Sequence, residues 1–113
     1  MKRTVIITAR IRDDYAELIR SGTKTYEVRD EPFGDAQVIH YISQNEGTSL
    51  GTYSLEGQFS LGRDEDSKLI SYAAISEEAF YELFPRATDG GPRCLWVARI
   101  GDQVDVEKLI GES

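Results

Sequence analysis

SGTKTYEVR, residues 21–29, contains the end of a helix, a turn and a strand within one short segment. The preceding residues 14–21 carry apolar side chains at helical spacing, and Gly22 stands where a left-handed residue commonly ends a helix. Residues 25–29 then alternate between polar and apolar side chains, which is typical of a half-buried strand. The sequence therefore predicts a helix, a tight turn and a strand in succession.

The polar positions of this segment bring three ionisable groups together. Glu27 and Arg29 are two residues apart, so their side chains leave the same strand face about 7 Å apart, with Thr25 completing the row. Lys24 lies at the preceding turn. Two interpretations follow from this spacing. The group is either one binding site or a surface salt-bridge ladder, usually worth no more than about 1 kcal/mol.

Elsewhere the sequence predicts short strands and few helices. Further strands are expected at residues 4–11, 37–43, 51–59, 93–100 and 103–106, a second helix at 76–84, a charged surface loop at 62–67 and a tight turn at 101–102. The two glycines within 51–59 are expected to mark bends or a bulge. Five or six strands with two or three short helices, in no regular alternation, favour an α+β fold with a mixed sheet curled into a small barrel.

Length and composition indicate one domain over residues 1–113. The chain has a formal net charge of -7, and its length suffices to bury a core without disulfides or a structural metal. Because Cys94 is the only cysteine and there is one histidine, neither an internal disulfide nor a Cys/His zinc site is expected, and no metal or cofactor is predicted. The short apolar run near the start cannot span a membrane. We therefore expect a cytoplasmic protein.

The charges are unevenly distributed. Residues 1–29 hold seven basic and four acidic side chains, whereas residues 30–113 hold six basic and sixteen acidic ones. Such a chain lacks the many Lys and Arg contacts that give sequence-independent affinity for nucleic acid. The basic segment is either a small cationic site or a solvated face that pairs with the acidic remainder. A mononucleoside or short oligonucleotide would suit a small site better than long RNA.

Several enzyme classes are excluded by missing motifs. The sequence has no GxxxxGK[ST], GxGxxG, HExxH or GxSxG segment. Cys94 and His40 each lie in an apolar strand, where a packed side chain is commoner than a nucleophile or a base.

Residues 22–29, GTKTYEVR, fit the pattern G-x-K-x-x-E-x-R, and the chain thereby resembles ASCH domains of the PUA-like superfamily. Residues 15–19 are similar to the helix that precedes the motif in that family, and residues 38–43 with 51–55 to its next two strands. Residues 75–84 resemble the late helix of the short stand-alone members, and residues 94–100 their closing strand. The resemblance implies a PUA-like β-barrel.

The resemblance also implies a cleft lined by Lys24, Glu27 and Arg29 that binds RNA or a nucleotide-like ligand. Arg29 offers a planar fork for a phosphate or a base edge, and Glu27 accepts hydrogen bonds from amino groups such as that of cytosine. Thr25, Tyr41 and Ser43 complete the predicted ligand-binding set.

Three aromatic residues are candidate stacking surfaces for an unpaired base. Tyr41, Tyr53 and Trp96 all lie in predicted strands, where packing in the core is the commoner fate. The choice between stacking and packing stays open at this point.

An enzyme is the main alternative, since some ASCH-like proteins hydrolyse N4-acetylcytidine or cleave RNA. A desolvated Lys24 would act as a base with Glu27 relaying the proton, without a metal. In the amidohydrolase pattern a threonine follows the lysine by three residues, but here that position is Glu27. A downstream acid is also expected there, with four candidates: Glu56, Asp64, Glu65 and Asp66. A third interpretation is a regulatory module that binds another protein, and the oligomeric state is not predicted.

Overall fold

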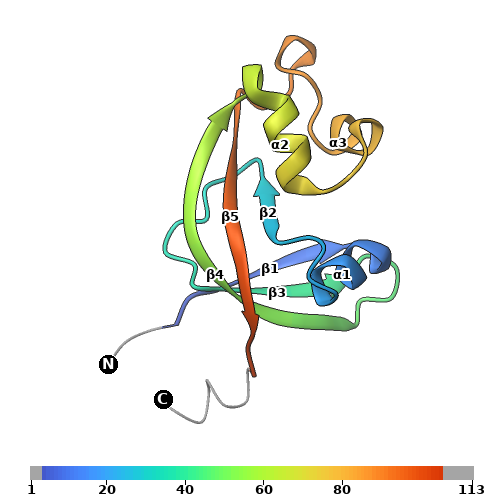
Figure 1. Cartoon of the computed structure of the whole chain (residues 1–113), viewed down its shortest axis with the longest axis vertical. Coiled ribbons are helices and arrows are strands. Elements are labelled where there is room, and N and C mark those ends of the chain that lie inside the picture. Colours follow the sequence, from blue (N-terminus) through green and yellow to red (C-terminus); the bar gives the residue numbers. More distant parts are fainter. Residues whose placement is uncertain (1–3, 106–113) are drawn as a thin grey trace.

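The structure, a computed structural model, describes residues 4–105 and is built on one curled five-stranded sheet (Figure 1). In spatial order the strands are β1-β3-β4-β5-β2; β1 and β3 are parallel, and the other neighbours are antiparallel. Their bounds are β1 Ile6–Ile11, β2 Tyr26–Arg29, β3 Val38–Ser43, β4 Ser49–Gly62 and β5 Cys94–Gln103. This mixed sheet confirms the predicted α+β class.

The curl of the sheet runs along β4, its longest strand. The pairing register between β4 and β5 shifts between Glu56 and Gln58, and Gly57 between them has a φ of +64°. Glycine reaches this left-handed conformation without steric cost, and the extra residue bends the strand. The predicted glycine bulge is confirmed here. Figure 1 shows β4 sweeping around the sheet beside β5.

Three α-helices cover the sheet: α1 Asp13–Arg20, α2 Asp66–Ala73 and α3 Glu77–Leu83. Two one-turn 3-10 helices also occur, Arg63–Glu65 and Ala87–Asp89. α1 lies on one half of the sheet, whereas α2 and α3 lie at the opposite end, with β2 between (Figure 1).

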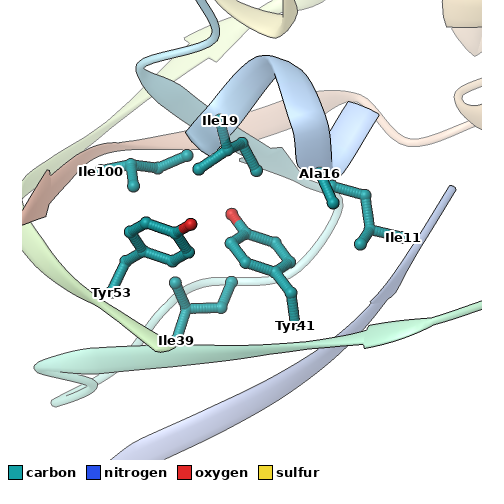
Figure 2. Close-up of a cluster of buried hydrophobic side chains, with 7 residues drawn as sticks. All are labelled: Ile11, Ala16, Ile19, Ile39, Tyr41, Tyr53 and Ile100. Carbon is teal, nitrogen blue, oxygen red and sulfur yellow. The ribbon is translucent and has the colours of Figure 1, made fainter. Parts of the chain in front are cut away.

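The first hydrophobic cluster lies beneath α1 (Figure 2). Ala16 and Ile19 of α1 point toward residues from four strands of the sheet, namely Ile11, Ile39, Tyr41, Tyr53 and Ile100. The rings of Tyr41 and Tyr53 meet edge to face with centroids 6.0 Å apart. Burial of these side chains stabilises the fold by about 25 cal/mol for each Å² of apolar surface removed from water.

A second cluster lies beneath α2 and α3. It consists of Val28, Leu69, Ala73, Phe80, Leu95 and Val97, and Phe80 is fully buried. The helix α3 begins at Ser76, whose hydroxyl accepts a 3.1 Å hydrogen bond from the amide of Ala79. This serine cap satisfies one of the free amides at the helix start.

The turn after α1 agrees with its prediction. Gly22 has a φ of +83°, and the amides of Thr23 and Lys24 each donate a 2.9 Å hydrogen bond to the carbonyl of Leu18. Closing the helix in this way directs the chain into β2.

The predicted loop at 62–67 is wrong. β4 runs to Gly62, and a 3-10 turn then leads into α2 at Asp66. The Arg63 side chain, 7% exposed, donates to Asp66 and to the carbonyls of Phe84 and Pro85, so a segment that looks like solvated loop is tied into the interior.

The predicted hairpin turn at residues 101–102 is also wrong, because β5 continues straight through it to Gln103. A Cβ on Gly101 would lie 2.2 Å from Ser54 Oγ, so glycine here permits close approach of β4 rather than a turn. Residue 106 of that prediction lies outside the described residues. None of the helices in residues 4–105 is both long and apolar enough to cross a membrane.

Candidate functional site

A cavity of about 380 Å³ opens among the ends of β1 and β2, α1 and the two helices α2 and α3. Four basic side chains line it, namely Arg10, Arg12, Lys24 and Arg29, with three acidic ones, Glu27, Asp30 and Glu82. Tyr41 of β3 and Tyr15 of α1 also line it. Its volume lies in the range of pockets that hold small organic molecules.

Lys24 lies in the turn before β2 and is buried, with 7% of its surface exposed. Its Nζ donates a hydrogen bond to the carbonyl oxygen of Ala73, the last residue of α2. The partial negative charge at a helix C-terminus favours a cation there. Burial lowers the pKa of Lys24, and the negative charge of Glu27 offsets part of that effect.

Glu27 lies on β2, and its Oε1 accepts a 2.8 Å hydrogen bond from the phenol of Tyr41. Burial raises the pKa of Glu27, while Lys24, the Tyr41 hydrogen bond and Arg29 each lower it. Burial also raises the pKa of Tyr41 well above its ordinary value, and the neighbouring Glu27 adds to this effect. Tyr41 is therefore a neutral donor that holds one oxygen of the carboxylate.

Arg29 ends β2 and has no ion pair within residues 4–105, although acidic side chains outnumber basic ones in the chain. Its guanidinium carbon lies 5.7 Å from the ring centre of Phe33, within the range of a cation–π contact. Both residues of the predicted pair Glu27 and Arg29 thus line one cavity and are not part of a surface salt-bridge ladder.

Two predicted site residues, Thr25 and Ser43, do not line the cavity. Thr25, the residue before β2, is exposed. Ser43 is fully buried; its hydroxyl donates a 2.6 Å hydrogen bond to Asp13 and accepts one of 3.1 Å from the amide of Glu46. Ser43 thereby joins the end of β3 to α1.

The three candidate stacking residues are at least partly buried and do not present an exposed ring to the cavity. Tyr41 is 1% exposed and Tyr53 is 6% exposed, and each ring lies in the cluster beneath α1. Trp96 is partly buried and does not line the cavity. Two partly exposed aromatic rings border the cavity, those of Tyr15 and Phe84, and the Arg12 guanidinium lies 4.6 Å from the centroid of the Tyr15 ring.

The four downstream acids considered as catalytic partners also lie away from the cavity. Asp66, for example, accepts hydrogen bonds from Arg63 and from the phenol of Tyr81. Asp30 and Glu82 border the cavity instead.

Cys94 and His40 do not line the cavity either, and His40 Nε2 lies 2.8 Å from Ser49 Oγ. Among residues 4–105, no three His, Cys, Asp or Glu side chains are grouped so that they would hold a metal ion.

Sequence analysis missed Arg10 and Arg12 as members of the site. The available signal was the excess of basic residues in 1–29, together with two arginines separated by one residue at a strand end. The G-x-K-x-x-E-x-R pattern covers residues 22–29 only and therefore does not include the arginines at the end of β1.

The site combines an oriented carboxylate with cationic donors. One oxygen of Glu27 is held by Tyr41, so the other is available to accept a hydrogen bond from a ligand amino group. Arg29 adds planar donors. Lys24 adds a positive charge, and because this charge is shielded from water, its electrostatic interactions are stronger. A polar, planar ligand with both donors and acceptors matches this set.

No protein-family model and no curated protein matches the sequence. Solved structures of ASCH from Zymomonas mobilis are among those that match the fold. The chain aligns with the crystal structure of ASCH from that organism at 18% identity and a TM-score of 0.68, covering 94% of this chain and 77% of the other.

Variants of the same protein give similar matches. A serine-to-alanine variant of ZmASCH aligns at 17% identity and a TM-score of 0.69, covering 98% of this chain and 81% of that one. A tyrosine-to-phenylalanine variant aligns at 17% identity and a TM-score of 0.67, covering 97% and 81%. The chain therefore has a small α+β fold. More specifically, its fold is that of ASCH domains, as predicted from the motif.

Proposed function

We propose that the protein binds RNA or a nucleotide-like ligand in the cavity around Glu27. The observation that carries this proposal is the convergence of Glu27, Lys24 and Arg29 on one cavity of about 380 Å³, with the carboxylate held by Tyr41. The ASCH fold supports the same class of function.

In this proposal the free oxygen of Glu27 accepts a hydrogen bond from the exocyclic amino group of a base such as cytosine or adenine. Arg29 donates to the ring nitrogen or carbonyl of the base, and the charge of Lys24 lowers the pKa of Glu27, which offsets part of the rise caused by burial. A base that presents a carbonyl oxygen in place of the amino group would leave Glu27 facing another acceptor, which disfavours uracil.

The ligand in this proposal is short. The formal net charge of -7 opposes wide contacts with a polyanion, whereas the four basic residues at the cavity give a local cationic site. A cytoplasmic location is part of the proposal, because RNA and nucleotides are abundant in that compartment.

The test is a binding titration, by calorimetry and amide NMR, with a cytidine trinucleotide and a uridine trinucleotide. The cytidine form should bind at least about tenfold tighter, and Arg29→Gln should weaken its binding by about 1–3 kcal/mol. Arg20→Gln is the matched control, because Arg20 pairs with Glu17 on α1 and does not line the cavity. Equal affinities for wild type and Arg29→Gln would overturn the proposal.

A second candidate function is hydrolysis of N4-acetylcytidine or RNA, and one observation favours it. Burial lowers the pKa of Lys24 and raises that of Glu27 in the same cavity, which moves both groups toward the range of general base and acid chemistry. Neither an acid from the predicted downstream group nor a threonine three residues after Lys24 is present in the cavity. Catalysis would therefore depend on Lys24 and Glu27.

This second candidate is tested by incubating the protein with N4-acetylcytidine and following acetate by proton NMR. Hydrolysis would give cytidine and acetate in equal amounts and would be abolished in Lys24→Met. Saturable binding without acetate, and with intact RNA in a parallel reaction, would leave the protein a binding module.

A further inference from the structure

Two arginines at the end of β1 extend the cavity beyond the residues of the motif. Arg10 is the penultimate residue of β1, and Arg12 follows the strand in extended conformation, with φ -68° and ψ 143°. On an extended backbone, side chains two residues apart leave the same side about 7 Å apart. Ile11 between them is buried in the cluster beneath α1, and both arginines line the cavity beside it.

Arg10 is exposed, and its guanidinium makes no hydrogen bond, ion pair or ring contact within residues 4–105. Like Arg29, Arg10 lines the cavity without an acidic partner among the described residues. All five N–H donors of Arg10 are therefore available to a ligand.

Arg12 is held in position rather than free. Its Nε and one terminal nitrogen donate to Asp14 at 3.1 and 2.8 Å, and the other terminal nitrogen donates to the Tyr15 hydroxyl at 3.3 Å. Its guanidinium also lies over the Tyr15 ring. Three of its five donors are thus used, and two remain for a ligand. Arg12 contributes oriented donors, and Arg10 contributes uncompensated charge.

We propose that Arg10 and Arg12 form a phosphate subsite at the mouth of the cavity, so that the ligand is a nucleotide and not a free nucleoside. This inference rests on the proposed function, in which the base lies against Glu27. Tetrahedral phosphate oxygens suit two forked donor groups spaced by about 7 Å, because each guanidinium reaches a different oxygen.

Two acidic residues of the cavity belong to other elements than this pair. Asp30 directly follows β2 and Glu82 belongs to α3, whereas Arg10 and Arg12 belong to β1 and the start of α1. Figure 1 shows β1 and α1 on one side of β2 and α3 on the other. A nucleotide would therefore direct its base toward Glu27 and its anionic phosphate toward the arginines.

The experiment compares cytidine, cytidine 5′-monophosphate and a cytidine trinucleotide without terminal phosphates, by calorimetry at low salt. The monophosphate should bind at least about tenfold tighter than cytidine, since charge-assisted hydrogen bonds contribute about 1.5–3 kcal/mol. Arg10→Gln should remove most of this preference, so that the affinities for cytidine and its monophosphate come close together. Inorganic phosphate should compete with the monophosphate and not with cytidine.

Arg20→Gln again serves as the control, because it removes the same charge from an arginine outside the cavity. Tighter binding of the trinucleotide than of the monophosphate would identify an RNA strand as the source of the phosphate, and the reverse would identify a mononucleotide.

The two levels of the proposal fail in different ways. Equal affinity for cytidine and its monophosphate, or a preference that survives Arg10→Gln, would overturn the phosphate subsite and leave the proposed function intact. Failure of all three ligands to bind would overturn both.

Discussion

The phenol of Tyr41 on β3 donates a 2.8 Å hydrogen bond to the carboxylate of Glu27 on β2, although β2 and β3 are not neighbours in the sheet. β4 and β5 separate them in the strand order, so only the curl of the sheet brings the two side chains together. This contact links the cluster beneath α1 to the cavity.

Tyr41→Phe should destabilise the fold by about 1.5–3 kcal/mol at pH 7, the usual worth of a hydrogen bond to a charged group. It should also raise the pKa of Glu27 further, because the Tyr41 hydrogen bond lowers that pKa. Urea unfolding and carboxyl carbon NMR measure the two effects. Tyr53→Phe is the matched control, since Tyr53 packs in the same cluster without a hydroxyl hydrogen bond within residues 4–105. Equal behaviour of the two variants would contradict the prediction.

Glu27→Gln should change how stability depends on pH. Burial raises the pKa of Glu27 in the folded protein above its ordinary value of 4.5, so the folded state holds this proton to higher pH than the unfolded state does. Relative to Glu27→Gln, the wild type should therefore be most stable below pH 4.5 and should lose stability as pH rises through the raised pKa. The loss should not exceed about 1.4 kcal/mol per pH unit.

This prediction is checked by urea unfolding of both proteins from pH 4 to 8. Taking the difference between them cancels most contributions from the other titrating groups. A difference that is flat, or that favours the wild type as pH rises, would contradict the assigned direction of the shift.

Arg63→Ala should destabilise the fold by about 3–5 kcal/mol, because it leaves Asp66 as a buried charge without its partner. Arg63 also donates to three carbonyl oxygens, those of Phe84, Pro85 and Pro92, and so joins the start of α2 to the segment after α3. Lys68→Ala is the control, since the Lys68–Glu65 pair has the same spacing but is exposed and should cost less than about 1 kcal/mol. If thermal unfolding showed similar losses of stability in Arg63→Ala and Lys68→Ala, the structural role assigned to Arg63 would be wrong.

Gly91→Ala should destabilise the fold more than Gly90→Ala, although the two glycines are adjacent. A Cβ on Gly91 would lie 1.8 Å from the carbonyl oxygen of Pro85, so the backbone would have to move, at about 3 kcal/mol or more. Gly90 has a φ of +84° but open space around it, and alanine there should cost about 1–2 kcal/mol. Chemical unfolding of the two variants decides the order, and a larger loss for Gly90→Ala would refute it.

Features set by local interactions were predicted well. The end of α1 at Gly22 and the strand that follows depend on residues within a few positions of one another, so their pattern is visible in the chain. α2 was missed because only Leu69 and Ala73 are buried along it, and its start looks like a charged loop. Its position depends on Arg63, whose carbonyl partners lie more than 20 residues away.

The sequence by itself determined the fold class and the grouping of Lys24, Glu27 and Arg29, because these depend on short-range spacing. Tertiary structure decided which side chains share the cavity: it excluded Thr25 and Ser43, and it added Arg10 and Arg12. Alternation along a strand predicts which residues share a face of the sheet, but it does not predict which elements pack against that face. That depends on the curl of the sheet and on helices contributed by distant parts of the chain.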